Sequence, residues 1–501
     1  MLKPAALFTD GAVLCRGKEI RVFGEADSGE TVQVTLLDED GETLAEAACV
    51  SAEGRFLATL PPQEARTSCR LVFRTEKEQA EAKDVAVGEV FLAGGQSNME
   101  LELRNADEGP GIIRTYDDPL LRFFNVPKIA IPGPEQRKAN EETRWNAVCP
   151  ERGGENSAVA YFFAAKLRER MPDVPVGIIG CYWGGTSVTC WMDEETLRTE
   201  PEGARYLDEY AARSAGKTME AWLEEDKAFW DTLNAWEKAV ADYQKDHPDA
   251  PWKEVEGACG PAPWNPPPGP GSPFRPAGLA ETMVREVVPA TLAGILYYQG
   301  EQDAEATDQY DVLMKLLIRS WRELFREEDL PFLFVQLPMW LNCDAEDNRC
   351  WAKLRLAQAK ARDETDHTGM ACLLDQGEYG NIHPTAKRPV GERLAELAGA
   401  MLYGGGEVSP RATGIAAEGN TMTVILSAPV KTKDGKDPNL LEVAGEDGQF
   451  VPARAEIRGN RLILEAEGVS RPVRARYAWT DYSCQVNLFG ENGLPLEPFS
   501  L

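Results

Sequence analysis

The sequence predicts an α/β protein with a mostly parallel central sheet between two small β modules. Five short apolar runs between residues 86 and 405 lack the polar–apolar alternation of half-exposed strands. Continuous apolar runs are typical of strands that are covered on both faces. Helix-like segments separate the runs, and alternating strands and helices indicate a parallel sheet. The chain of 501 residues is long enough for about three domains, which fits this division.

These runs and helices define a central domain that is predicted to span residues 86–405. The expected strands are 90–93, 176–179, 293–298, 332–337 and 370–374. The expected helices are 158–170, 310–325, 349–362 and 387–402. In an open parallel sheet, ligands bind outside the carboxyl ends of the strands, so functional residues should follow the predicted strands.

The flanking segments have a different pattern, in which short strand-like runs alternate with turn sequences. In residues 1–85 these runs are 20–23, 32–37, 56–60 and 71–74. In residues 406–501 they are 421–426, 461–465 and 473–479. Short strands separated by turn signals are typical of small sandwiches. We therefore expect a β-sandwich-like module at each end of the chain.

An acidic insertion at 194–278 interrupts the central domain. It carries a stripe of large apolar residues at helical spacing: Trp222, Phe229, Leu233, Trp236, Val240 and Tyr243. Such a stripe either packs a helix onto its own protein or forms a dimer contact, so a monomer and a homodimer are both compatible with it. The segment 261–276 is rich in proline, which excludes helices and central strands and predicts a path over the surface.

The composition limits the partners and the chemistry of the protein. With 53 basic and 82 acidic residues, the net charge is −29, which disfavours nucleic acid and membrane surfaces as partners. Eleven cysteines are scattered without a Cys-x-x-Cys pair, and only three histidines are present, so no metal site is expected. Single cysteines suit a reducing compartment. No apolar run is long enough to span a membrane or to form a signal-peptide core. We therefore expect a cytoplasmic protein.

Two of the predicted strands end in glycine-rich turns. Ser97 follows the first strand, in Gly-Gly-Gln-Ser-Asn-Met at 94–99, where the glycines allow a sharp exit. This serine is placed to be a nucleophile, although a serine there also suits the cap of the next helix. Gly184 and Gly185 follow the second strand. Their backbone N–H groups suit an oxyanion hole, and a plain tight turn is the alternative.

The third and fifth strands lead into the remaining candidates. Gln299, Glu301 and Asp303 cluster after the third strand, and His383 lies in Ile-His-Pro at 382–384 after the fifth. The other two histidines lie in polar segments, where we expect them to be solvated. Acyl transfer needs a serine and a base within hydrogen-bond reach, whatever their separation in sequence. Ser97 and His383 fit that requirement.

Together these motifs resemble those of the sialate O-acetylesterases, a family of the SGNH (GDSL-like) hydrolase superfamily. The shared motifs are Gly-Gln-Ser-Asn-Met at 95–99, Trp-Gly-Gly-Thr at 183–186, Tyr-Gln-Gly-Glu at 298–301 and Ile-His-Pro at 382–384. Trp351, Arg355 and Gln358 match a helix motif of the family as well. The likeness runs from near residue 85 to the end and leaves the insertion unmatched. It implies a flavodoxin-like SGNH hydrolase domain between the two β-sandwich-like modules.

The resemblance also implies the roles of the residues that perform the reaction. Ser97 would be the nucleophile and His383 the general base. The oxyanion would be held by Ser97, by Gly184 or Gly185, and by Gln299. Gln96, Asn98 and Trp183 are expected to contact the substrate.

The third member of the triad is where the sequence departs from the family. SGNH enzymes commonly place an aspartate just before the histidine, and this chain has Asn381 there. Related acetylesterases recruit the glutamate of the Gln-Gly-Glu motif, so Glu301 is the expected third member. Asp375, Asp303 and a serine–histidine dyad are the alternatives.

The resemblance implies a serine carboxylester hydrolase that removes O-acetyl groups from sialic acids through an acetyl-enzyme, without a metal or an organic cofactor. Acetylxylan or another plant polysaccharide is the alternative substrate, and a carbohydrate-binding protein without activity is the alternative from another class. An anionic sialate needs a local basic pocket, for which Arg104, Arg144 and Arg275 are candidates. Activity is expected to fall as His383 protonates, at about pH 6.

Overall fold

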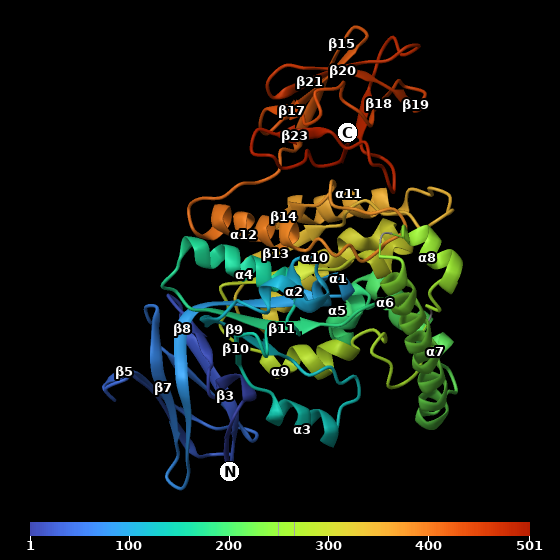
Figure 1. Ribbon diagram of the computed structural model, residues 1–501. Helices are drawn as coiled ribbons and strands as arrows, with labels where there is room; N and C mark the ends of the chain where they lie inside the picture. The colour runs from blue at the N-terminus through green and yellow to red at the C-terminus, as the bar shows by residue number, and fades with distance from the viewer. Residues whose placement is uncertain (249, 265) are drawn as a thin grey trace.

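A sheet of parallel strands crosses the middle of the molecule, with helices packed against it (Figure 1). The computed structural model describes residues 1–248, 250–264 and 266–501. Residues 249 and 265, both within the predicted insertion, lie outside the described residues. The parallel strands follow one another in space as β9 (Asp118–Asn125), β11 (Val176–Tyr182), β8 (Gln79–Gly95), β12 (Gly294–Tyr298), β13 (Phe332–Gln336) and β14 (Thr368–Cys372).

Five of these strands are those that the apolar runs predicted, and β9 is an additional one. Its sequence includes Pro119 near the start and Arg122 in the middle, which hides the apolar pattern. Arg122 is nevertheless buried, because its guanidinium donates to the backbone carbonyls of Pro119 and Gly11 and pairs with Asp84. A short antiparallel strand, β10 (Asn146–Val148), closes this edge of the sheet.

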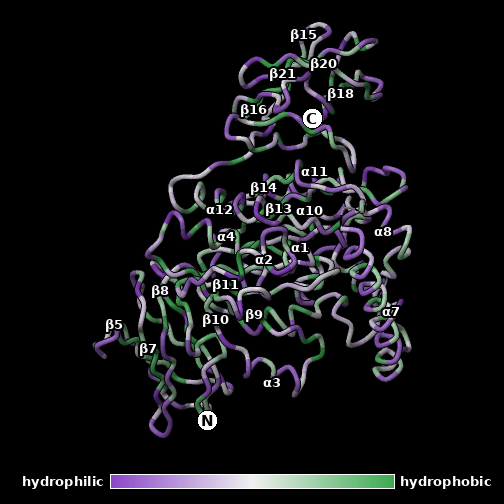
Figure 2. Tube along the Cα trace, in the orientation of Figure 1, coloured by the Kyte–Doolittle hydropathy of each residue, from purple (hydrophilic) through white to green (hydrophobic). Residues whose placement is uncertain are grey.

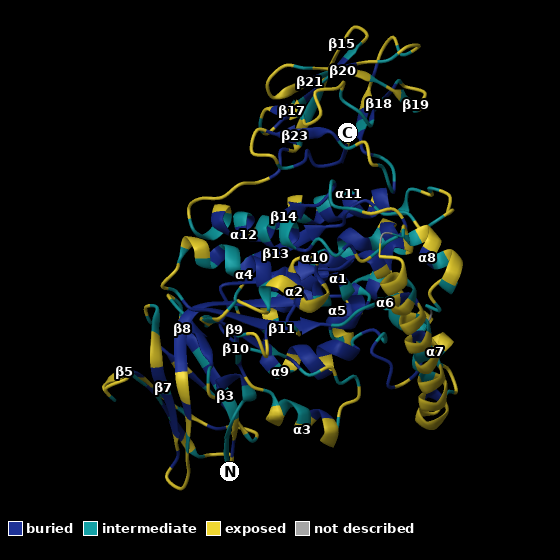
Figure 3. Cartoon of the chain, in the orientation of Figure 1, coloured by how far each residue is buried: buried dark blue, intermediate teal, exposed yellow. Residues whose placement is uncertain are grey.

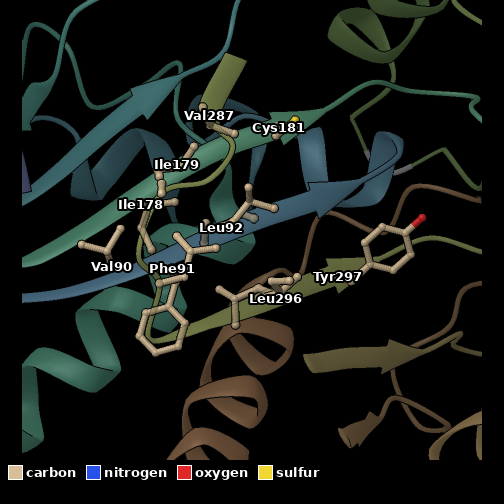
Figure 4. Packing of buried hydrophobic residues seen from close by; sticks show 14 of the residues in the cluster. Val90, Phe91, Leu92, Ile178, Ile179, Cys181, Val287, Leu296 and Tyr297 are labelled. Atoms are coloured by element: carbon tan, nitrogen blue, oxygen red, sulfur yellow. The ribbon is translucent and has the colours of Figure 1, made fainter. Parts of the chain in front are cut away.

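The central strands have continuous apolar sequences because the fold buries both of their faces. β11, β12 and β13 are buried at every position. Phe91, Leu92, Ile178 and Leu296 pack together at the middle of the sheet (Figure 4). Figure 3 shows β11 and β13 in the buried middle of the molecule. Burying one such side chain contributes about 1.5–3 kcal/mol.

The four helices predicted for the central domain are present within a few residues of their expected bounds. They are α4 (Ala158–Arg170), α10 (Thr307–Leu324), α11 (Cys350–Asp363) and α12 (Arg388–Leu402). α4 packs on α12, and α10 packs on α11. α4 begins after Ser157, whose hydroxyl accepts a hydrogen bond from the backbone N–H of Ala160 and so caps the helix.

One long strand joins the first module to the central sheet. The first part of β8 pairs with β7 (Arg66–Arg74) in antiparallel fashion, and its second part pairs with β11 and β12 in parallel. The predicted boundary at residue 85 therefore falls inside a strand. The other predicted strands of this module appear as β3 (Ile20–Ala26), β4 (Thr31–Leu37) and β6 (Arg55–Leu60).

The last module lies beyond α11 and α12 (Figure 1), and its apolar core also takes in Met339, Cys372 and Leu374 of the central domain. Two antiparallel four-stranded sheets make up most of it. One has the order β15 (Ala412–Glu418), β16, β21, β20 (Arg454–Ile457), and the other has the order β19 (Phe450–Pro452), β18 (Leu441–Ala444), β22, β24 (Phe499–Ser500). The three predicted strands are β16 (Thr421–Leu426), β21 (Arg461–Glu465) and β22 (Arg474–Tyr477).

The insertion is largely helical, and its apolar stripe packs within the chain. It contains α6 (Pro201–Arg213), α7 (Met219–Asp246) and α8 (Trp252–Cys259). Trp222 and Trp236 of α7 donate their indole N–H groups to the carbonyls of Pro267 and Gly260. Much of the remaining surface of α7 is exposed and hydrophilic (Figures 2 and 3). In the described parts of the chain, no helix is both long and apolar enough to cross a membrane.

Candidate active site

Ser97 and His383 meet at the carboxyl edge of the parallel sheet. Ser97 is the first residue of α1 (Ser97–Glu100), which follows the end of β8, and His383 lies in the loop between β14 and α12. The Nε2 atom of His383 is 2.8 Å from the Oγ atom of Ser97. The fold therefore places a nucleophile-type hydroxyl and an imidazole in hydrogen-bond contact.

Gly95 makes the sharp exit of β8 possible. Its φ angle is +132°, and a β-carbon at this position would lie 2.1 Å from the carbonyl oxygen of Tyr298 on β12. A side chain would therefore collide with the neighbouring strand. With glycine, the chain turns directly from the sheet into α1 and presents Ser97 at the sheet edge.

The imidazole of His383 favours its neutral, proton-accepting form. Burial among protein atoms and the positive charge of Lys387 lower its pKa, to about 4. The residue also keeps part of its surface open to solvent, which moderates the effect of burial. Its backbone N–H donates to the side-chain oxygen of Asn381. In the parts of the chain that the structure describes, no carboxylate hydrogen-bonds to His383.

The three carboxylates considered as third triad members are all engaged away from the imidazole. Glu301 accepts a hydrogen bond from Asn98 at 2.6 Å, and burial raises its pKa. Asp375 is held by two hydrogen bonds from Arg393, which outweigh its burial and lower its pKa. Asp303 accepts from Ser187, Val188, Gln299 and Tyr206. None of the three carboxylates hydrogen-bonds to His383 in this structure, whereas Ser97 does.

The side chain of Gln299 differs from the sequence-based expectation of an oxyanion donor. Its Nε2 atom donates to Asp303 at 2.6 Å and to the carbonyl of Thr186 at 3.1 Å, and it also lies 3.2 Å from the amide oxygen of Gln96. Both of its N–H groups are therefore committed inside the protein. Gln299 is 1% exposed and supports the turn after β12 from within.

The glycine turn after β11 offers one backbone N–H group and has the other one occupied. Gly184 donates to the carboxylate of Glu100 at 2.5 Å. The N–H groups of Gly185 and Ser97 make no hydrogen bond with any described residue. These two groups are therefore the open backbone donors beside Ser97.

Two of the three residues expected to contact substrate are enclosed by the protein. Gln96 is 3% exposed, and its amide oxygen faces the turn at 299–302. Asn98 is 1% exposed. Neither is open to a sugar, because the glycine-rich turn folds them inward while it presents Ser97. Trp183 is half-buried and stays available for contact.

An aromatic residue of the insertion lies over the glycine turn. A β-carbon at Gly185 would lie 2.1 Å from the Trp264 ring and 3.2 Å from the Phe274 ring. Trp264 also packs edge-on against Phe229 of α7 and Phe274. The proline-rich segment therefore brings a half-buried indole to the site, rather than running over a remote surface.

The basic residues proposed for an anionic substrate are each engaged with the protein itself. Arg104 pairs with Glu102 and Glu155, and Arg275 pairs with Glu281. Arg144 donates to backbone carbonyls. Among the described residues, no three His, Cys, Asp or Glu side chains gather in a way that could hold a metal ion.

Sequence reasoning missed three residues that the structure places at the site: Glu100, Trp264 and Lys387. Glu100 lies in the same motif as Ser97, and Lys387 lies four residues after His383, but neither spacing indicates a contact on its own. Trp264 lies in a proline-rich segment, where no periodic pattern exists to predict its position. Only the tertiary fold brings these side chains to the sheet edge.

A comparison with known proteins shows that part of the chain is similar to a known family. Residues 277–399 match the family described as carbohydrate esterase, sialic acid-specific acetylesterase. That segment includes His383 and the turn at 299–303, whereas Ser97 lies outside it.

Relatives of known activity are similar over almost the whole chain. The sialate O-acetylesterases of Rattus norvegicus and Homo sapiens are each 23% identical to it; the matches cover 96% and 95% of this chain and 90% and 88% of those proteins. Among solved structures, a carbohydrate acetylesterase from Xanthomonas citri is 28% identical, with a TM-score of 0.76 and 99% of both chains covered.

Proposed function

We propose that this chain, a carbohydrate esterase related along its length to the sialate O-acetylesterases, removes O-acetyl groups from sugars through an acetyl-serine intermediate. The 2.8 Å contact between Ser97 and His383 is the observation that carries this mechanism. A parallel sheet that presents the serine after one strand and the histidine after another supports an SGNH-type hydrolase domain. The segments 1–85 and 406–501 are then its flanking modules.

The first half of the reaction acylates the enzyme. Ser97 Oγ attacks the carbonyl carbon of the acetyl group while His383 Nε2 accepts the hydroxyl proton. The N–H groups of Ser97 and Gly185 stabilise the negative charge on the carbonyl oxygen. The C–O bond to the sugar then breaks, and the imidazolium returns its proton to the departing sugar oxygen.

The second half regenerates the enzyme with water. His383 accepts a proton from a water molecule, whose oxygen attacks the acetyl-serine carbonyl. The bond to Ser97 Oγ breaks, Ser97 regains a proton from the imidazolium, and acetic acid leaves. Each step uses groups of the chain together with water.

O-acetylated sialic acid is the first substrate that we propose, because the relatives that match most of the chain act on it. One observation favours a second candidate, a neutral acetylated polysaccharide such as acetylxylan. The cations Arg104, Arg275 and Lys128 are each paired with carboxylates, so none of these three is free to hold a sialate carboxylate.

Acetate release tests the proposal and chooses between these substrates. Wild-type protein, Ser97→Ala and Ser470→Ala are incubated in parallel with O-acetylated sialic acid and with acetylxylan. Ser470 is exposed in the last module, so its variant is the matched control. We expect release by the wild type and Ser470→Ala, and a loss of about 10⁴-fold or more in Ser97→Ala.

The pattern of release then decides the substrate and the mechanism. Release from acetylxylan alone would keep the mechanism and replace the substrate. Release from either substrate that survives in Ser97→Ala would contradict the serine mechanism. No release from either, with the chain folded, would favour a carbohydrate-binding protein.

A further inference from the structure

A buried amide connects the serine turn to the histidine loop. Asn98 directly follows Ser97 and is 1% exposed. Its Nδ2 atom donates to Glu301 Oε1 at 2.6 Å and to the carbonyl oxygen of Ile382 at 3.0 Å. Its Oδ1 atom accepts a hydrogen bond from the ammonium of Lys387. Both polar atoms of the Asn98 side chain are therefore used, in three hydrogen bonds.

The partners of Asn98 hold both sides of His383. Ile382 directly precedes the histidine, and Lys387, four residues after it, is the N-cap residue of α12. Because Asn98 is adjacent to Ser97, one side chain spans the gap between the two loops. Its position thereby influences the separation of Ser97 Oγ and His383 Nε2.

The two charged neighbours also fix which way the amide points. Burial lowers the pKa of Lys387 to about 7, so below that pH it is an ammonium, which has only donors and must face the amide oxygen. An ionised Glu301 accepts from the amide nitrogen. A reversed amide would place two donors together and two acceptors together. Lys387 and Glu301 thus ensure that the nitrogen also reaches the carbonyl of Ile382.

Burying the ionisable groups of Lys387 and Glu301 costs free energy that packing alone does not explain. Lys387 is 2% exposed, and one Glu301 oxygen is buried without a hydrogen-bond partner. Replacing buried ions with well-packed apolar residues is often neutral or stabilising. Their presence beside a histidine without an orienting carboxylate points to a task in the reaction.

We propose that Asn98 is a positioning residue that holds the Ser97 turn and the His383 loop in register, with Lys387 and Glu301 fixing its amide. It performs the orienting task that a third triad carboxylate would otherwise perform. This inference rests on the proposed function, because it concerns the same serine and histidine.

The first test removes the amide donor at constant shape. In Asn98→Asp, a carboxylate faces Glu301 and the carbonyl of Ile382, so the link is replaced by repulsion. We expect kcat/KM for 4-nitrophenyl acetate to fall about 100-fold, the loss typical of a small misplacement of reacting groups. Asn105→Asp makes the same change at an exposed asparagine nearby and is expected to stay within twofold of wild type.

Rescue separates positioning from general damage. In Asn98→Asp/Glu301→Gln, the new amide donates to the new carboxylate and restores the hydrogen bond between residues 98 and 301. We expect at least a tenfold recovery of kcat/KM over Asn98→Asp. Absence of recovery, or Asn98→Asp within twofold of wild type, would overturn the inference.

A second variant keeps the inference testable if Asn98→Asp does not fold. Lys387→Met removes the buried charge at similar volume and leaves the amide free to rotate. We expect kcat/KM to fall at least tenfold. We also expect the acid limb of the pH profile to move upward, because the charge that disfavours protonation of His383 is gone. Glu301 and Glu378 are the carboxylates that act on Lys387 itself.

The outcomes distinguish this inference from the proposed function. If Ser97→Ala hydrolyses 4-nitrophenyl acetate as fast as wild type, the serine mechanism is wrong, and Asn98 then has no catalytic pair to position. If hydrolysis depends on Ser97 but Lys387→Met keeps both its rate and its acid limb, the positioning role of Asn98 is wrong while the serine mechanism stands.

Discussion

At the scale of single residues, the hydrogen bond between Ser97 and His383 organises the site. The two residues could be chosen from the sequence because both follow buried strands, whose carboxyl ends share one edge. The use of the remaining side chains could not be predicted in this way. Gln299 and Asn98 are polar residues in the expected turns, yet their amides face inward and bind Asp303 and Glu301.

The pH dependence belongs to this scale. His383 acts as a base in its neutral form, so activity falls as the pH falls through its pKa. Burial and Lys387 lower that pKa towards about 4. Exposure to solvent limits the shift, so the acid limb of kcat/KM should have its midpoint between about 4 and 6.5. The sequence alone led to a midpoint of about pH 6.

Initial rates with 4-nitrophenyl acetate across the acid range give this midpoint. Circular dichroism at each pH shows whether the chain stays folded over the limb. A midpoint above 6.5 in folded protein would contradict a histidine whose charged form is disfavoured.

At the scale of elements, the boundaries of the central strands and helices were predictable, and the contacts between segments were not. The continuous apolar sequences of β11, β12 and β13 followed from burial on both faces. β9 was missed because Arg122 interrupts its pattern, although backbone carbonyls satisfy the guanidinium. The proline-rich segment has no periodicity, so its approach to Gly185 depends on the packing of the whole insertion.

The contact between Gly185 and Trp264 leads to a prediction at this scale. Gly185 has a φ of +72°, and a β-carbon there would overlap the indole. Gly185→Ala should displace both the indole and the backbone N–H, and loss of one oxyanion donor lowers kcat about 10²-fold. Gly185→Ala/Trp264→Ala should recover part of this loss, because the space is then free.

Gly216→Ala is the matched control for backbone strain. Gly216 has a φ of +74°, and no atom lies within 4 Å of a β-carbon at that position. This variant bears the same strain, roughly 1–2 kcal/mol, without the overlap. Acetate release by the four proteins measures the effect; equal rates for Gly185→Ala and Gly216→Ala would contradict a role for the turn.

At the scale of the whole molecule, the segments predicted as three regions are joined more tightly than their sequences indicated. β8 runs without a break from the first module into the central sheet. The last module meets the central domain through Arg362 on α11, which makes two 3.0 Å hydrogen bonds to the buried carboxylate of Glu497. Pairings between distant segments leave no local sequence signal, which is why these joints could not be predicted.

The ion pair between Arg362 and Glu497 predicts that two carboxylates of the last module contribute differently to stability. Glu497→Ala leaves Arg362 without its buried partner and should lower the free energy of unfolding by about 3–5 kcal/mol. Glu456→Ala removes an exposed pair with Arg458 and should change stability little. Urea unfolding measures both variants. Similar unfolding midpoints for the two variants would contradict the stabilising role of the Arg362–Glu497 pair.

Activity at low temperature should be similar in both variants, because neither residue touches the Ser97 turn or the His383 loop. Acetate release by the folded proteins checks this expectation. A large loss in Glu497→Ala under conditions where it is folded would instead link the last module to the site.

The most direct test of the serine–histidine mechanism is the reaction of the full chain with a fluorophosphonate, with the modified residue identified by mass spectrometry. A serine activated by a neighbouring imidazole reacts far faster than an ordinary hydroxyl. We predict that Ser97 is the residue modified and that its modification is about 100-fold or more slower in His383→Ala. An unmodified Ser97 in protein that releases acetate, or an equal rate in His383→Ala, would contradict the mechanism.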